Sequence, residues 1–165
     1  MTRVARFTPV LVLAALALAA CAAPAPAASP EPTVAEGCSE VTVVVDFGVL
    51  DEPSVEACAS AGIALDVLAE AGVTTEGTVD YGDQVVCRVN DEPAADETVT
   101  VEGQAPFVEA CLTFNSVAYW ALWVKPAPDG EWEYAQEGVT TLELSDGQSV
   151  GLVYTPATDT IPPQD

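Results

Sequence analysis

Histidine is absent from the 165-residue chain and basic residues are scarce: four Lys and Arg stand against 26 Asp and Glu, for a net charge of −22. Histidine is the usual general base near neutral pH and the commonest ligand of transition metals, so its absence removes both from the candidate chemistry. A strongly acidic surface repels nucleic acid and anionic lipid headgroups and favours solubility. The composition therefore excludes nucleic-acid partners, and we expect no metal and no cofactor.

Motifs for catalysis are also missing. The sequence contains no Gly-x-Ser-x-Gly, no phosphate-binding loop and no Cys-x-x-Cys. The acidic stretches DYGD (80–83) and NDEPAADE (90–97) offer oxygen atoms but lack the ligand spacing of a calcium loop, so we interpret them as solvated acid. No carboxylate pair of the glycosidase kind can be singled out among 26 acids. The sequence predicts a protein that is not an enzyme.

The N-terminus carries the one long apolar run of the chain. MTRVAR, with two arginines and no acid, precedes an uncharged segment and then small residues, which is the order of a secretory signal peptide. The run Val10 to Ala20 has 11 residues, too few to span a bilayer at about 1.5 Å per residue. Extended from Phe7 to Ala23 it has 17, the lower limit for a span, so a retained helical anchor is the alternative.

The four residues LAAC, 18–21, resemble the bacterial lipobox, in which small residues precede an invariant cysteine. The resemblance implies that residues 1–20 are a lipoprotein signal peptide and that Cys21 becomes the lipidated N-terminus on the extracytoplasmic side of the cell membrane. Ordinary secretion with Cys21 discarded or unpaired is the alternative. Two or three acyl chains hold a membrane far more firmly than one. Cleavage removes both early arginines and leaves a net charge of −24.

The mature chain divides into three parts. Residues 21–37 are the lipidated cysteine and an Ala- and Pro-rich tether, which in an extended form reaches roughly 45 Å from the membrane. Residues 38–154 form one domain of ordinary size for a single core. Residues 155–165 are predicted to be a disordered tail.

Four cysteines lie in the domain: Cys38, Cys58, Cys87 and Cys111. An even number in an exported chain predicts two disulfides with three connectivities, and the wide spacing argues against zinc. We favour the sequence neighbours, Cys38–Cys58 and Cys87–Cys111, while the other two connectivities stay open.

Hydrophobic periodicity predicts an α+β domain. Alternation over residues 41–47 places Val41, Val43 and Val45 on one face of a strand. Apolar residues at helical spacing predict a helix over 62–72 that ends at Gly72. Further strands are predicted over 55–59, 84–90, 116–125, 131–134, 140–145 and 148–154, the last two as a hairpin turning at Asp146-Gly147. The order predicts a mainly antiparallel sheet with one helix packed across it.

Several stretches together resemble the transcobalamin-like C-terminal domain family: GIALDVLAEAG (62–72), VVCRVN (85–90), AYWALWV (118–124) and the final run GEWEYAQEGVTTLELSDGQSVGLVY (130–154). The resemblance covers most of residues 41–154 and implies a β-grasp-like fold. Family members include modules of bacterial surface proteins and the terminal domain of vitamin B12 carriers, so a corrinoid ligand is implied only by analogy. The chain departs from the family pattern by reading NDEP where Asn-Gly is usual.

Aromatic residues are sparse overall but concentrated in one place. Tyr119, Trp120, Trp123, Trp132 and Tyr134 fall within 16 residues on two predicted strands. One interpretation is cross-strand packing that holds a hairpin; the other is a platform for a flat or apolar ligand, neutral or cationic in this acidic setting.

Arg88 is one of two cations in the mature chain, the other being Lys125. It is interpreted either as a structural ion pair or as a group that binds an anionic part of a ligand. Together the observations predict a membrane-anchored lipoprotein with a small-ligand-binding module, serving an uptake system through a transporter partner. The alternative is a passive envelope module that binds protein partners and no small molecule.

Overall fold

The computed structural model describes residues 38–164. The predicted signal peptide, Cys21 and tether lie outside the described residues. Within 38–164, no helix has the length and apolar character required to cross a membrane.

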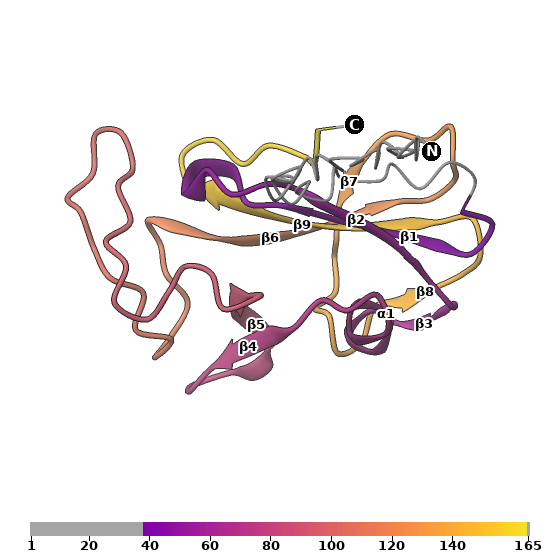
Figure 1. Ribbon diagram of the computed structural model, residues 1–165, viewed down its shortest axis with the longest axis horizontal. Coiled ribbons are helices and arrows are strands. Elements are labelled where there is room, and N and C mark those ends of the chain that lie inside the picture. The colour runs from indigo at the N-terminus through magenta and orange to yellow at the C-terminus, as the bar shows by residue number, and fades with distance from the viewer. Residues whose placement is uncertain (1–37, 165) are drawn as a thin grey trace, which may run out of the picture.

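A five-stranded sheet forms the centre of the domain (Figure 1). Its strands, in spatial order, are β2 (Val55–Ala59), β1 (Val41–Asp46), β9 (Ser149–Pro156), β6 (Ala118–Lys125) and β7 (Glu133–Tyr134). β1 and β9, the first and last strands, are parallel neighbours, and every other pair in this sheet is antiparallel. The prediction of a mainly antiparallel sheet is confirmed.

The hydrophobic core lies on one face of this sheet, as the alternation along the first strand predicts. Val41, Val43 and Val45 are fully buried, and the residues between them are half-buried. Helix α1 (Ala64–Glu70) packs Val67 and Leu68 into the same core. We call this the helix-side face of the sheet.

Smaller elements lie at one end of the central sheet and on its helix side, which is below the sheet in Figure 1. A 3-10 helix, η1 (Gly48–Leu50), follows β1. The short strands β3 (Gly62–Ile63) and β8 (Glu143–Leu144) pair with each other, as do β4 (Thr75–Thr78) and β5 (Gly82–Val89). The domain is therefore α+β, with a single α-helix among the described residues.

The hairpin predicted at Asp146-Gly147 is wrong. Gly147 has a φ of +80°, so the turn itself forms where glycine permits it. The flanking strands do not pair with each other: β8 pairs with β3, and β9 pairs with β1 and β6. Because β9 already has a neighbour on each side, β8 has no edge of β9 to join.

Both favoured disulfides are present. Cys38 and Cys58 have Cα atoms 5.9 Å apart, and Cys87 and Cys111 have Cα atoms 5.5 Å apart. The first pair follows from the register of β1 and β2, which places Thr42 opposite Cys58 and so brings the start of the domain beside it. The second pair joins β5 to the segment that leads into β6.

The predicted disordered tail is also corrected over its described part. β9 continues to Pro156, Thr155 is 1% exposed, and its Oγ1 donates to the carbonyl of Asp159 at 2.9 Å. The amide of Ala157 donates to Val117 O at 2.9 Å, and Pro163 is buried. The polar, proline-rich composition of the tail does not indicate this packing, because the apolar surface that the tail covers belongs to strands far away in the sequence. We call the face that it covers the tail-side face.

Candidate functional site

The central sheet divides the aromatic cluster between its two faces. Side chains alternate along β6, so Trp120 enters the core on the helix side. Tyr119 and Trp123 belong to a separate apolar cluster with Val153 and Trp132 on the tail side. The five aromatic residues that the sequence grouped together therefore do not form one continuous platform.

Trp120 has a structural role. It is 6% exposed, and its ring makes edge contacts with Phe47 at 5.5 Å and Tyr154 at 5.3 Å between ring centroids. Its indole Nε1 donates to the carbonyl of Glu92 at 3.3 Å. These contacts tie β6 to the residue before η1, to β9 and to the 90–97 loop, and not to the other strand of the predicted aromatic hairpin.

The tail-side aromatics form the predicted cross-strand contacts. Trp123 and Tyr134 lie directly opposite each other on β6 and β7, and their rings meet edge to face at 5.4 Å. Lys125 Nζ lies 4.9 Å from the ring centroid of Trp132. Tyr119 contacts Phe114 at 5.1 Å between centroids. Phe114 was missed in the sequence because it lies in a loop with no strand pattern of its own.

A cleft of about 160 Å³ opens at the edge of β6. β7 pairs only with Trp123 and Val124, and the amide of Ala135 then donates to Leu122 O before the chain turns away. The cleft occupies the space that this short strand leaves beside β6. It is lined by residues of β5, β6, β7, β9, the loop before β6 and the segment after β7: Gln84, Val85, Val86, Phe114, Tyr119, Trp120, Leu122, Tyr134, Ala135, Glu137, Gly138, Val139 and Leu152.

The lining of the cleft is mainly apolar and aromatic, with two polar side chains besides the tyrosines. Gln84 supplies an amide and Glu137 a carboxylate, and neither Arg88 nor Lys125 is among the lining residues. Three of the six predicted ligand-binding residues, Tyr119, Trp120 and Tyr134, line the cleft. The apolar contribution of Val86, Leu122 and Leu152 was missed, because each is indistinguishable in the sequence from an ordinary core residue.

The Tyr134 hydroxyl at the cleft is protonated at neutral pH. Burial raises the pKa of Tyr134 to about 12, and a hydrogen bond with Tyr119 contributes to the rise. The Tyr119 hydroxyl also lies 3.0 Å from Thr160 Oγ1 in the tail. The Tyr134 phenol therefore brings a hydrogen-bonding group to the cleft without bringing charge.

Tyr154 lies behind the cleft on β9. It is 1% exposed, its hydroxyl has no hydrogen-bond partner among residues 38–164, and burial raises its pKa. A void of about 10 Å³, close to the minimum for one water molecule, adjoins it and shares Val85, Val86, Phe114 and Tyr119 with the cleft. The inner end of the cleft is therefore next to a neutral, buried hydroxyl.

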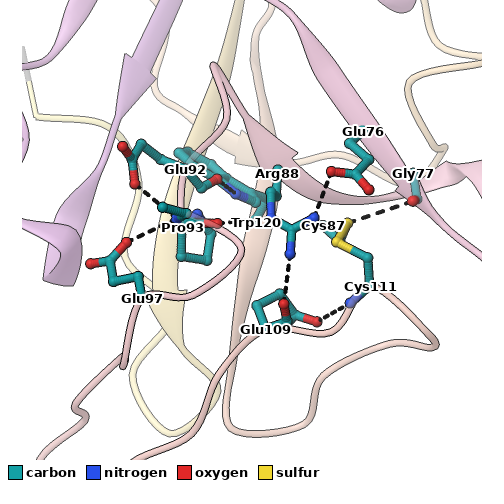
Figure 2. A network of polar contacts seen from close by, with 11 residues as sticks. Glu76, Gly77, Cys87, Arg88, Glu92, Pro93, Glu97, Glu109, Cys111 and Trp120 are labelled. Atoms are coloured by element: carbon teal, nitrogen blue, oxygen red, sulfur yellow. Dashed lines mark hydrogen bonds and ion pairs between the residues drawn. A yellow bond between two sulfur atoms is a disulfide. The ribbon is translucent and has the colours of Figure 1, made fainter.

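Arg88 does not reach the cleft; it organises the loops on the helix side (Figure 2). Its Nη1 forms an ion pair with Glu76 Oε2 at 2.6 Å. Its Nε donates to Pro93 O at 2.8 Å and its Nη2 to Glu109 O at 2.6 Å. These contacts fit the structural ion-pair interpretation, since an anionic ligand would have to displace them.

The carboxylates near Arg88 are also engaged with backbone groups (Figure 2). Glu109, 6% exposed, accepts from the amide of Cys111 and the side-chain amide of Asn115, both at 2.8 Å. Glu92 and Glu97 both accept from the amide of Ala94. Burial, followed by the hydrogen bond and charge of Glu97, raises the pKa of Glu92.

Among the described residues, one cluster has the composition of a metal site: Glu76, Cys87 and Cys111. Because the two sulfur atoms are bonded to each other, the cluster offers no thiolate ligand. Its geometry is explained by the disulfide and the Arg88–Glu76 ion pair beside it (Figure 2).

No protein-family model, curated protein or solved structure matches the chain.

Proposed function

We propose that the chain is a lipid-anchored, extracytoplasmic lipoprotein whose domain captures a small, neutral or cationic ligand with a single ring. The observation that carries the proposal is the cleft of about 160 Å³ at the edge of β6, walled by Phe114, Tyr119 and Tyr134. Most ligand pockets are largely apolar with a few polar groups that fix orientation, which is the character of this lining.

The size of the cleft limits the class of ligand. Most ligand pockets enclose roughly 300–1,000 Å³, whereas an apolar cavity of about 150 Å³ is known to bind benzene. The cleft, at about 160 Å³, matches the smaller case. A corrinoid is a macrocycle many times larger than one ring, so we propose a single-ring ligand in place of the corrinoid that the family resemblance implied.

Charge narrows the class further. Glu137 lines the cleft and no Lys or Arg does, and the chain as a whole has a net charge of −22. Aromatic faces attract cations through the ring quadrupole, most strongly where water is excluded. An anionic ligand would meet repulsion from Glu137 without a compensating cation, so neutral and cationic ligands are favoured.

The wider setting is proposed from the sequence and the topology together. A helix on one face of a sheet whose first and last strands are parallel central neighbours supports a β-grasp-like fold and the resemblance to transcobalamin-like domains. The LAAC motif after a basic and then apolar segment supports lipidation at Cys21. We propose that the domain presents its ligand to a transporter in the same membrane.

Ligand-observed NMR tests the proposal with three probes of one ring and different charge: benzyl alcohol, benzyltrimethylammonium and benzoate. The protein is the chain from residue 21 with Cys21→Ser, so that no lipid is added. We expect the neutral and cationic probes to bind and benzoate not to bind.

Two matched substitutions locate the binding. Leu122→Trp fills the cleft and should abolish binding, whereas Leu112→Trp makes the same change at a side chain that is 60% exposed and outside the cleft lining. Binding of none of the probes, or equal binding to both variants, would exclude the cleft as the ligand site.

A further inference from the structure

The C-terminal tail packs against the tail-side face of the sheet, next to the cleft, with which it shares Tyr119 as a neighbour. Pro163 is buried, and its Cγ would be 2.5 Å from a Cβ atom at Gly151. Trp132 flanks the same spot, since its Cη2 would be 3.2 Å from that Cβ. Because Gly151 has no side chain, the ring of Pro163 and the indole ring of Trp132 both lie close to its backbone.

Further aromatic side chains lie on the same face. Trp123 and Trp132 belong to the small apolar cluster of the tail-side face, together with Val153 and Tyr119. The Tyr119 hydroxyl lies within hydrogen-bond distance, 3.0 Å, of Thr160 Oγ1. We give the name proline groove to the surface formed by Tyr119, Trp123, Trp132 and Gly151, of which Tyr119 also lines the cleft.

The proline groove also holds a donor without an acceptor. Trp123 Nε1 is buried and has no hydrogen-bond partner among residues 38–164. A buried indole N–H usually finds an acceptor. Proline-rich segments in the polyproline II form present backbone carbonyls that are not used internally, and they dock on aromatic-lined grooves.

The tail has the chemistry of such a segment. After Asp159, residues 160–164 form neither helix nor strand, and Pro162-Pro163 restricts the backbone toward the polyproline II region. Ile161 remains 39% exposed, so the tail contributes little apolar burial besides Pro163. Segments with few buried contacts open at low free-energy cost, which makes this occupant displaceable.

We propose that the proline groove binds a proline-rich, extended segment of a partner protein in the cell envelope, and that the chain's own tail occupies the groove in its absence. The tail then acts as a competitive strap: it shields the aromatic face until a segment with more proline contacts replaces it. A tethered competitor has an effective concentration on the order of 1 mM. The partner segment must therefore bind the proline groove tightly enough to displace the tail at that concentration.

Isothermal titration calorimetry tests the proposal on the chain from residue 21 with Cys21→Ser, as the full form and as a form ending at Asp159. The partner-type probe is the peptide (Ala-Pro-Pro)₃, and the second probe is the tail peptide ATDTIPPQD. A third peptide, ATDTIAAQD, is matched to the tail peptide and lacks both prolines.

We expect both proline peptides to bind the truncated form. They should bind the full form about tenfold more weakly, because the tail competes for the same surface. ATDTIAAQD should not bind. Trp132→Ala should abolish binding, because Trp132 belongs to the proline groove and not to the cleft. Leu122→Trp should leave binding unchanged, because Leu122 packs on the helix side of β6 and Tyr119 is the one residue that the cleft and the proline groove share.

Three results would overturn the proposal. Binding of the tail peptide without binding of (Ala-Pro-Pro)₃ would mean that the groove is only a seat for the tail. Equal binding to the full and truncated forms would show that the tail does not compete for the proline groove. Equal binding of ATDTIPPQD and ATDTIAAQD would remove proline recognition, and this comparison holds even if Trp132→Ala fails to fold.

Discussion

Arg88 Nη2 donates to the backbone carbonyl of Glu109 at 2.6 Å, across 21 residues of sequence and in a buried position. With the bond to Pro93 O and the ion pair to Glu76, one side chain connects the β4–β5 hairpin to the two loops that precede β6. The sequence marked Arg88 as unusual for its charge; the structure shows that its partners are mostly backbone carbonyls.

Arg88→Ala is expected to lower the free energy of unfolding by about 2–5 kcal/mol, because it leaves buried carbonyl groups unsatisfied and removes the ion pair. Glu76→Gln is the matched control: the Glu76 side chain is 55% exposed, so we expect a loss of about 1 kcal/mol or less. Urea denaturation at pH 7 measures both. Equal losses would show that the ion pair, and not the carbonyl contacts, is the main contribution.

Gly151→Ala is expected to displace the tail, since its Cβ would be 2.5 Å from Pro163 and 3.2 Å from Trp132. Overpacking of this kind typically costs about 1–3 kcal/mol. Exchange of the hydrogen-bonded amides of Ala157 and Asp159 should accelerate. In the control, Gly62→Ala, the nearest atom to the new Cβ is Val67 Cγ2 at 4.0 Å, so tail exchange should stay unchanged. Unaltered tail exchange in Gly151→Ala would contradict the packing.

The two disulfides are expected to differ in their rate of reduction. Cys87 and Cys111 are 6% and 4% exposed, whereas Cys58 is exposed and Cys38 half-buried. Because thiol–disulfide exchange requires access to a sulfur atom, Cys38–Cys58 should be reduced first. Brief treatment with dithiothreitol, alkylation and peptide mass spectrometry give the order. Loss of Cys87–Cys111, which closes a 24-residue separation, should then cost about 3 kcal/mol.

Glu92→Gln is expected to stabilise the protein at neutral pH. The raised pKa of Glu92 in the folded state means that its protonated form is favoured there, so its contribution is present below the unfolded-state pKa and is lost as pH rises through the folded-state pKa. Glutamine keeps an acceptor for Ala94 and replaces the repulsion of Glu97 with an amide donor. Thermal unfolding at pH 7 should show a higher midpoint for the variant, and the difference should vanish at low pH. A difference independent of pH would contradict this cause.

Cys21→Ala is expected to release the protein from the membrane or leave it misprocessed, if the thiol of Cys21 is the lipid attachment point. Fractionation of cells that express each form, with mass spectrometry of the N-terminal peptide, measures this. A membrane-bound variant with unchanged processing would instead favour a retained helical anchor. Cysteine substitutions in the domain are no substitute for this test, because all four form disulfides.

The sequence by itself determined the α+β class, the buried face of β1, the single helix and the two disulfides. These features depend on local patterns: alternation for a strand, a spacing of three and four for a helix, and an even number of cysteines in an exported chain.

Only the tertiary structure decided which segments meet. Asp146-Gly147 specifies a turn in either case, but β8 pairs with β3 because β1 and β6 occupy both edges of β9. The cleft combines Gln84, Phe114 and Glu137 from three distant segments, and its volume depends on the point at which β7 leaves β6. The tail is packed because Gly151 leaves room for Pro163. Each of these contacts joins residues far apart in the chain, and no periodicity within either segment encodes its partner.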